Sequence, residues 1–148
     1  MFDPNQFLET QITESNATEL IPIPEAEYAG VIGAVETKVW AKKDDPSISG
    51  IKLVVMWDLD SQELLDLLGR KKVTVKQEIM LDLTESGGLD VGKGRNVGLG
   101  RLRAALNLNN PGEPFSFLMM VGRVARLHIG QRLVNDTIYP DIKGVARM

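Results

Sequence analysis

Hydrophobic and polar residues alternate in five segments of the chain, which is the pattern expected of half-buried β-strands. The alternation is most regular in the third segment, where valine, isoleucine and leucine occupy one face and lysine, threonine and glutamate occupy the other. The five predicted strands span residues 28–41, 51–60, 72–83, 115–129 and 133–146. The last two strands are predicted to form a hairpin. The pattern therefore predicts a mainly β fold.

Two further segments have the composition of helices. Residues 97–108 form the main predicted helix, with Asn96 as its N-cap. Its apolar stripe consists of Leu99, Leu102 and Leu106, at positions i, i+3 and i+7. A shorter helix is predicted over residues 62–68, where Ser61 can cap the start and Gly69 can end it. The main helix thus lies between the third and fourth strands, and the short helix between the second and third.

This order of elements predicts the architecture. Five strands with one main helix between strands three and four is the element order of the OB barrel, whose usual ligands are single-stranded nucleic acids or oligosaccharides. The first strand contains Gly30 and Gly33, and glycines within strands often mark the bends that a small barrel needs. We therefore predict that residues 25–148 form a five-stranded OB-like barrel.

Residues 1–24 show no sustained periodicity and are predicted to form an N-terminal arm that lies over the body, held by Phe2 and Phe7. The arm also explains the charge distribution. The formal net charge is −3, yet residues 1–27 contain six acidic residues and no lysine or arginine. The other 14 of the 20 acidic residues share residues 28–148 with all 17 basic residues, which gives that part a charge of +3. The body is mildly basic and the arm is acidic, a split that is compatible with a polyanionic ligand.

Several kinds of chemistry are excluded by composition. The chain has no cysteine, so it has no disulfides, thiolate metal ligands or cysteine nucleophile. His128 is the only histidine, which excludes a histidine-rich metal site. No apolar stretch approaches the roughly 18 residues of a membrane span, and no basic leader precedes an apolar run. We expect a cytoplasmic protein without a cofactor or a membrane partner.

Two motifs suggest enzymes. The glycine-rich stretch 87–94 imitates a phosphate-binding loop, but Gly94 stands where the magnesium-binding serine or threonine is required. Asp58 and Asp60 lie two residues apart on one strand face, and two-metal nucleases use such pairs together with further acids. The same pair also fits a solvated strand end before the short helix. We predict no enzymatic activity.

The basic and aromatic residues indicate a different function. Binding of single strands requires cations that follow the phosphates and flat side chains on which bases stack. The predicted cationic contacts are Lys42, Lys43, Lys52, Lys72, Lys76, Arg123, Arg126 and Lys143. Trp40 and Tyr139 are the predicted stacking residues, and His128 is a further nucleic-acid contact. Trp57 shares its strand face with aliphatic residues and is predicted to lie in the core.

A second positive cluster precedes and enters the main helix. It consists of Lys93, Arg95, Arg101 and Arg103, with no acidic residue between them. The cluster fits a second set of phosphate contacts, and it also fits an ordinary solvated surface.

Four stretches carry a resemblance to a known family. They are Ile-Pro-Glu-Ala-Glu-Tyr-Ala-Gly-Val-Ile at 23–32, Leu-Asp-Val-Gly-Lys-Gly-Arg-Asn at 89–96, Met-Val-Gly-Arg-Val at 120–124 and Tyr-Pro-Asp-Ile-Lys-Gly-Val at 139–145. In order and spacing the chain resembles a family of small phage-encoded single-stranded-DNA-binding proteins. The resemblance implies an OB fold, DNA binding without strong sequence preference, and a role in phage replication or recombination within the host cytoplasm.

The resemblance has one departure, and a second function class stays open. Many replication-type single-strand binders end in an acidic tail that recruits partners, whereas this chain ends Lys-Gly-Val-Ala-Arg-Met. Replication or recombination proteins are candidate partners, but recruitment of a polymerase or helicase through such a tail is not expected. The alternative is a structural or adaptor module that uses an OB-like barrel to hold another protein, because a fold does not determine a function. The oligomeric state, a homo-oligomer included, is left open.

Overall fold

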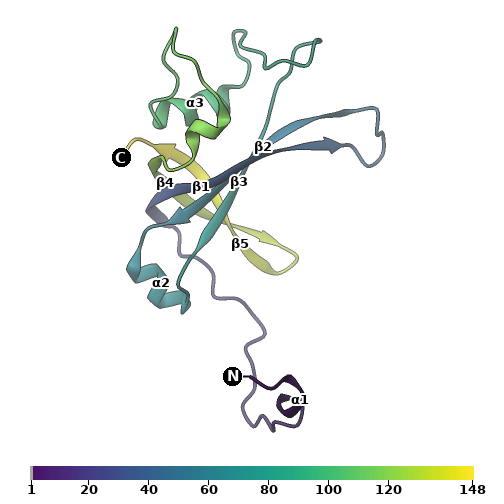
Figure 1. Cartoon of the computed structure of the whole chain (residues 1–148), viewed down its shortest axis with the longest axis vertical. Coiled ribbons are helices and arrows are strands. Elements are labelled where there is room, and N and C mark those ends of the chain that lie inside the picture. The colour runs from purple at the N-terminus through teal and green to yellow at the C-terminus, as the bar shows by residue number, and fades with distance from the viewer. Residues whose placement is uncertain (1) are drawn as a thin grey trace.

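The computed structural model describes residues 2–148 and contains one antiparallel sheet of five strands in the order β3-β2-β1-β4-β5 (Figure 1). The strands are β1 (Ala26–Ala41), β2 (Ser49–Leu59), β3 (Thr74–Met80), β4 (Val124–Val134) and β5 (Thr137–Ala146). The predicted mainly β fold is confirmed. Each predicted strand overlaps an observed one, with ends that differ by a few residues except at the start of β4.

The helices are α1 (Pro4–Phe7), α2 (Gln62–Leu68), α3 (Val97–Ala105) and the short 3-10 helix η1 (Phe117–Met120). The two predicted helices, α2 and α3, lie where the order of elements placed them, whereas the two short helices α1 and η1 were not predicted. The bounds of α2 match the prediction. The hydroxyl of Ser61 accepts a hydrogen bond from the Leu64 amide (3.2 Å), and Gly69 ends the helix with a positive φ of 64°. The main helix, α3, ends earlier than expected, at Ala105.

The prediction that the side chain of Asn96 caps α3 is wrong. Asn96 precedes the helix, but it has a left-handed backbone (φ 51°) and its side chain makes no capping hydrogen bond. Its side-chain amide instead donates to the carbonyl oxygens of Asp82 (2.9 Å) and Asp90 (2.8 Å). Asn96 therefore ties the glycine-rich loop after β3 to the start of the helix.

The long strand β1 belongs to both halves of the sheet. Residues 26–31 pair with β4, and residues 30–41 pair with β2, with an irregularity between Ile32 and Ala34. The strand bends at this bulge, and its far half continues with β2 as a hairpin that projects from the body (Figure 1). The bend brings the two edge strands, β3 and β5, to face each other. In the described part of the chain no hydrogen-bonded ladder joins them, so the closure expected of a complete barrel is absent there.

A single hydrophobic core lies between the curved sheet and α3. Ile32, Trp57, Leu102 and Leu127 are each no more than 1% exposed and come from different elements. The predicted core position of Trp57 is confirmed, and its indole Nε1 donates to Oε1 of Gln77 (2.8 Å). The predicted inward residues Val73, Val75 and Leu81 and the leucine stripe of α3 are also buried, whereas Ile79 is half-buried against the core.

The hairpin between β4 and β5 is tighter than expected. The sequence suggested a connection over residues 130–136, whereas the strands continue to Val134 and restart at Thr137. Asn135 and Asp136 both have positive φ (49° and 65°), as the two central residues of a type I′ turn require. The start of β4 is also later than predicted, because η1 and its flanking turns occupy residues 117–122.

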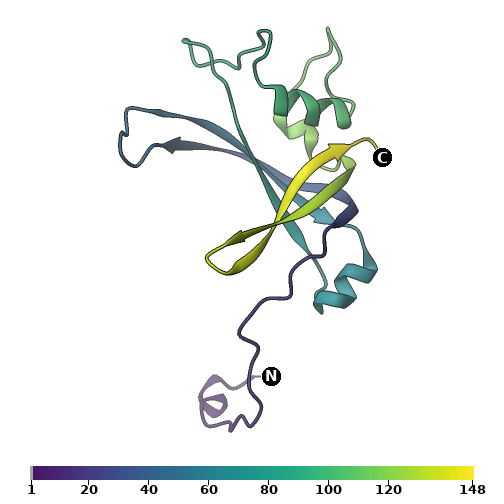
Figure 2. The same cartoon turned by 180° about the vertical axis from the view of Figure 1, so that it is seen from behind.

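The expectation that the N-terminal arm lies over the body is wrong. The arm extends away from the sheet in the two opposite views of Figure 1 and Figure 2. Phe2 is 97% exposed and Phe7 is 70% exposed, so neither holds the arm to the core. The arm joins the body at Ile23, whose carbonyl accepts a hydrogen bond from the Gln131 side chain (3.0 Å).

We expect Leu127→Ala to lower the free energy of unfolding by about 2–5 kcal/mol, because the fully buried side chain would leave a cavity. Leu133→Ala is the matched control on the same strand, where the residue is 68% exposed. It should change stability by less than about 0.5 kcal/mol. Urea unfolding followed by circular dichroism measures both. Equal losses would contradict the inward face assigned to β4.

Candidate nucleic-acid interface

A cleft of about 570 Å³ lies between the two edge strands, β3 and β5, and we call it the edge cleft. Its lining includes consecutive residues of β3, the end of β4 and the first half of β5. The polar, charged and aromatic side chains among them are Thr74, Lys76, Gln77, Glu78, Arg132, Tyr139 and Asp141. The cleft exists because the sheet curves without closing.

The strand registers explain which side chains reach this cleft. On β3, Lys76 and Glu78 alternate with the buried Val75 and therefore point outward. Arg132 of β4 is paired with Tyr139 of β5, and the two-residue turn between these strands fixes that pairing. Tyr139 is 43% exposed, so part of its ring is open to a flat ligand.

The charges around the edge cleft favour an anion. Glu78 forms an ion pair with Lys52 (3.3 Å), and Asp141 forms one with Lys143 (2.9 Å). Within residues 2–148, neither Lys76 nor Arg132 has a carboxylate within salt-bridge distance. The two acids are thus neutralised, and two cations remain without a partner.

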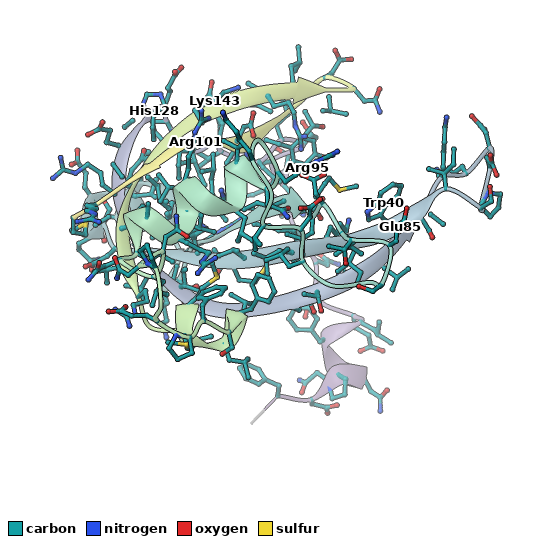
Figure 3. The ribbon with its side chains drawn as sticks, turned by 90° about the horizontal axis from the view of Figure 1, so that it is seen from above. Trp40, Glu85, Arg95, Arg101, His128 and Lys143 are labelled. Carbon is teal, nitrogen blue, oxygen red and sulfur yellow. The ribbon has the colours of Figure 1, made fainter. Side chains whose placement is uncertain are left out.

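Trp40 lies on the projecting β1–β2 hairpin, away from Lys143 and His128 (Figure 3). The bulge in β1 reverses the strand's alternation, so that Val35 packs against the core and Trp40 lies on the outer face. Its indole lies against Gly50, where a Cβ would come within 2.9 Å of Nε1. This Nε1 is buried and has no hydrogen-bond partner in the described structure. The hairpin itself therefore positions the indole.

The remaining predicted contacts on the first three strands are dispersed. Lys42 and Lys43 lie in the exposed loop at the tip of the β1–β2 hairpin. Lys52 lies on the outer face of β2, opposite Met80 of β3, and is therefore next to the edge cleft. Lys72 precedes β3 and is 3.7 Å from a carboxylate oxygen of Asp58.

The predicted contacts near β4 lie on a different part of the surface. Arg126 and His128 point outward from β4, opposite Ala29 and Glu27 of β1. His128 Nε2 is 3.8 Å from a carboxylate oxygen of Glu25. Arg123 precedes the strand and is exposed. The structure brings Lys76, Tyr139 and Lys52 together around the edge cleft, with Lys143 at its border. Arg123, Arg126 and His128 lie away from it.

Arg132 is the cleft residue that the sequence did not single out. It is one of several cations in the last part of the chain, and nothing in its immediate neighbours distinguishes it. Its place opposite Tyr139 depends on the two-residue Asn-Asp turn. Asparagine and aspartate are among the residues that dominate type I′ turns, so Asn-Asp between two alternating segments could have predicted the pairing.

The two enzyme-like motifs have the following surroundings in the described residues. Asp58 accepts a hydrogen bond from the Thr74 hydroxyl (2.8 Å) in addition to its ion pair with Lys72. Across residues 2–148 no group of three or more His, Cys, Asp or Glu side chains could hold a metal ion. The glycine-rich stretch 87–94 contains Leu89, which forms an isolated antiparallel bridge with Leu83, whereas a phosphate-binding loop follows a parallel strand.

An acidic cavity of about 400 Å³ lies elsewhere, beside α2. Its lining includes Glu27, Asp60 and Glu63 around the ring of Tyr28. Burial raises the pKa of Tyr28 above its usual value, and the negative charge of Glu63 raises it further. A polyanion would be repelled from this cavity, whereas the edge cleft has cations without a partner.

Comparisons with known proteins add no family assignment. No protein-family model matches the chain, and no curated protein sequence is significantly similar to it. The resemblance to phage single-stranded-DNA-binding proteins therefore stays a prediction. None of the helices described in residues 2–148 has the length and apolar character needed to cross a membrane.

We expect Gly50→Ala to displace the Trp40 indole, because the added methyl group would stand 2.9–3.0 Å from three of its atoms. The displaced indole should be more accessible to acrylamide, which fluorescence quenching measures, while the buried Trp57 stays protected. Gly144→Ala is the matched control, since its added Cβ would meet no atom within 4 Å. Unchanged quenching in Gly50→Ala would contradict this contact.

Proposed function

We propose that this chain is a non-enzymatic protein that binds single-stranded DNA largely without sequence preference. The observation that carries the proposal is the edge cleft, which combines unpaired cations with a partly exposed aromatic ring. Lys76 and Arg132 would neutralise phosphates, and Tyr139 would stack a base. Binding of this kind sequesters the strand and needs neither a cofactor nor a metal.

The arrangement of strands supports an OB-like barrel as the scaffold. The OB fold is a five-stranded, partly open barrel that binds oligonucleotides on the face of strands two and three and with the loops between strands one and two and four and five. In this chain the unjoined edges β3 and β5 correspond to the open part. Lys52 and Lys76 lie on the face of strands two and three. Trp40 and Tyr139 come from the two hairpins.

The choice of DNA and the biological setting come from the resemblance described above. It supports a role in phage DNA replication or recombination, in the cytoplasm of the host cell. Lys143 would add a phosphate contact at the border of the cleft, and Lys42 and Lys43 would add contacts at the tip of the β1–β2 hairpin. Arg123, Arg126, His128 and Lys72 lie off the cleft, so on this proposal they contribute only long-range attraction.

One observation favours the alternative, an adaptor that holds another protein. The arm exposes apolar side chains on an acidic segment, including Leu8 (83% exposed) and Ile12 (71% exposed). Under this alternative the arm is the docking element and the cations are ordinary surface. The absorbance ratio at 260 and 280 nm of the purified protein discriminates the two, because co-purified nucleic acid raises it.

We expect binding of a labelled oligo(dT) to weaken with salt, with log K falling by about 0.7 per log unit of salt for each neutralised phosphate. Arg132→Ala and Lys76→Ala should each reduce this slope by about 0.7. Arg70→Ala is the control, because Arg70 is an exposed arginine beside α2, outside the edge cleft. Fluorescence anisotropy at several salt concentrations measures the slopes. Absence of binding at low salt would contradict the proposal.

Tyr139→Ala is expected to weaken oligo(dT) binding by about 1–3 kcal/mol, the usual contribution of one base stacked on an aromatic ring. Tyr139→Phe should bind almost as well as the unaltered protein, because stacking needs the ring and not the hydroxyl. The same anisotropy titration measures both variants. If Tyr139→Phe lost as much affinity as Tyr139→Ala, the residue would act through its hydroxyl and the stacking role would be wrong.

A further inference from the structure

The edge cleft does not end at β5. A second cavity of about 310 Å³ shares Gln77 and Ile142 with it and extends toward α3. A third cavity of about 460 Å³ shares Arg101 with the second and continues along the helix toward the glycine-rich loop. Because each cavity shares lining residues with the next, the three lie in a row from the edge cleft to the loop that precedes α3, and we call this row the groove.

We infer that the bound strand continues from the edge cleft across α3, where Arg101, Lys143 and Arg95 contact further phosphates. This inference rests on the proposed function and extends its site beyond the sheet. Figure 3 shows Arg101 of α3 close to Lys143 of β5 in the view from above, with Arg95 farther along. Both Arg101 and Lys143 line the second cavity, and Arg95 lines the third.

The charges along this extension favour phosphate. Arg101 is exposed, and in the described part of the chain it forms neither an ion pair nor a side-chain hydrogen bond. The second cavity has no acidic residue in its lining. The third has only Asp90, which lies 3.8 Å from the Arg95 guanidinium.

Arg103 differs from its neighbours and has a structural role. Its guanidinium lies 4.0 Å from the centre of the Phe115 ring, and its Nε donates to the carbonyl oxygen of Leu108 (2.9 Å). These contacts hold the segment after α3 against the helix. Arg101 is therefore the residue of α3 that is free to bind an anion.

The glycines of α3 support a close approach of the ligand. Gly98 and Gly100 lie within the helix, where each glycine costs about 1 kcal/mol relative to alanine. A Cβ at Gly100 would meet no atom within 4 Å, and one at Gly98 would only touch Ile79 at 4.0 Å, so packing does not require either glycine. Because these positions have no side chain, the helix backbone beside Arg101 is uncovered. Glycine commonly occurs where backbone approaches a ligand closely.

The test compares two lengths of oligo(dT), about 6 and about 16 nucleotides, which lie near the ends of the range of OB-fold site sizes. Only the longer strand should reach from the edge cleft to α3. Arg101→Ala should therefore reduce the salt slope for the longer strand by about 0.7 and leave the slope for the shorter strand unchanged. Arg101→Lys should restore most of the slope.

A second variant tests the path without removing a charge. Gly100→Leu places a large side chain on the open helix surface and should weaken binding of the longer strand only. Because leucine favours a helix more than glycine does, this variant should be at least as stable as the unaltered protein, which thermal unfolding checks. Arg70→Ala again serves as the control and should change neither length.

The outcomes separate this inference from the proposed function. If neither strand binds the unaltered protein, the proposed function itself fails. If both strands bind and Arg132→Ala lowers both slopes while Arg101→Ala lowers neither, the edge cleft is the whole site and the extension is wrong. An equal effect of Arg101→Ala on both lengths would also overturn the extension, because Arg101 would then belong to the primary site.

Discussion

The structure depends on one constraint, which is that β1 pairs with β4 through its first part and with β2 through its second. The strand bends between these two parts, at the bulge beside Gly33 (Figure 1). The bend rolls the sheet around Trp57 and Leu127 and brings β3 and β5 opposite each other. The core, the edge cleft and the projecting hairpin all follow from this geometry.

The electrostatics of the cleft follow from how the ion pairs are distributed. On the outer face of the sheet most lysines stand beside a carboxylate, as Lys38 does with Glu36 and Lys52 with Glu78. Exposed pairs of this kind contribute little stability. They matter here because they cancel charge locally, so that the attraction for a polyanion comes from the cations without partners. Three of those cations, Lys76, Arg132 and Arg101, line the groove between β3, β5 and α3.

Local patterns in the sequence predicted the elements, but they do not contain the strand irregularities that set which face a residue occupies. The regular alternation of β3 and the capped helix α2 were predictable, because each depends on neighbouring residues alone. The outward position of Trp40 depends on the bulge in β1, and a shift of one residue reverses the faces of a strand. The irregularity between His128 and Ile129 in the pairing of β4 with β5 likewise changes the face on which Lys143 lies.

The candidate site was predictable only in part for a similar reason. Lys76 and Tyr139 could be chosen by residue type, but the cleft that joins them is formed by strands far apart in the sequence. Arg132 and Arg101 reach the groove through a turn type and through the placement of α3 against β5, neither of which leaves a local charge pattern. The acidic arm was expected to cover the body because its two phenylalanines are apolar, yet both are exposed.

The measurement that tests this account most directly is a nitrogen–proton NMR titration of the full chain with oligo(dT). The account predicts that the amide shifts map to β3, β5 and α3, with the largest changes around Lys76, Tyr139 and Arg101. Shifts concentrated around the acidic cavity at Tyr28 and Glu63, or no shifts at low salt, would contradict it.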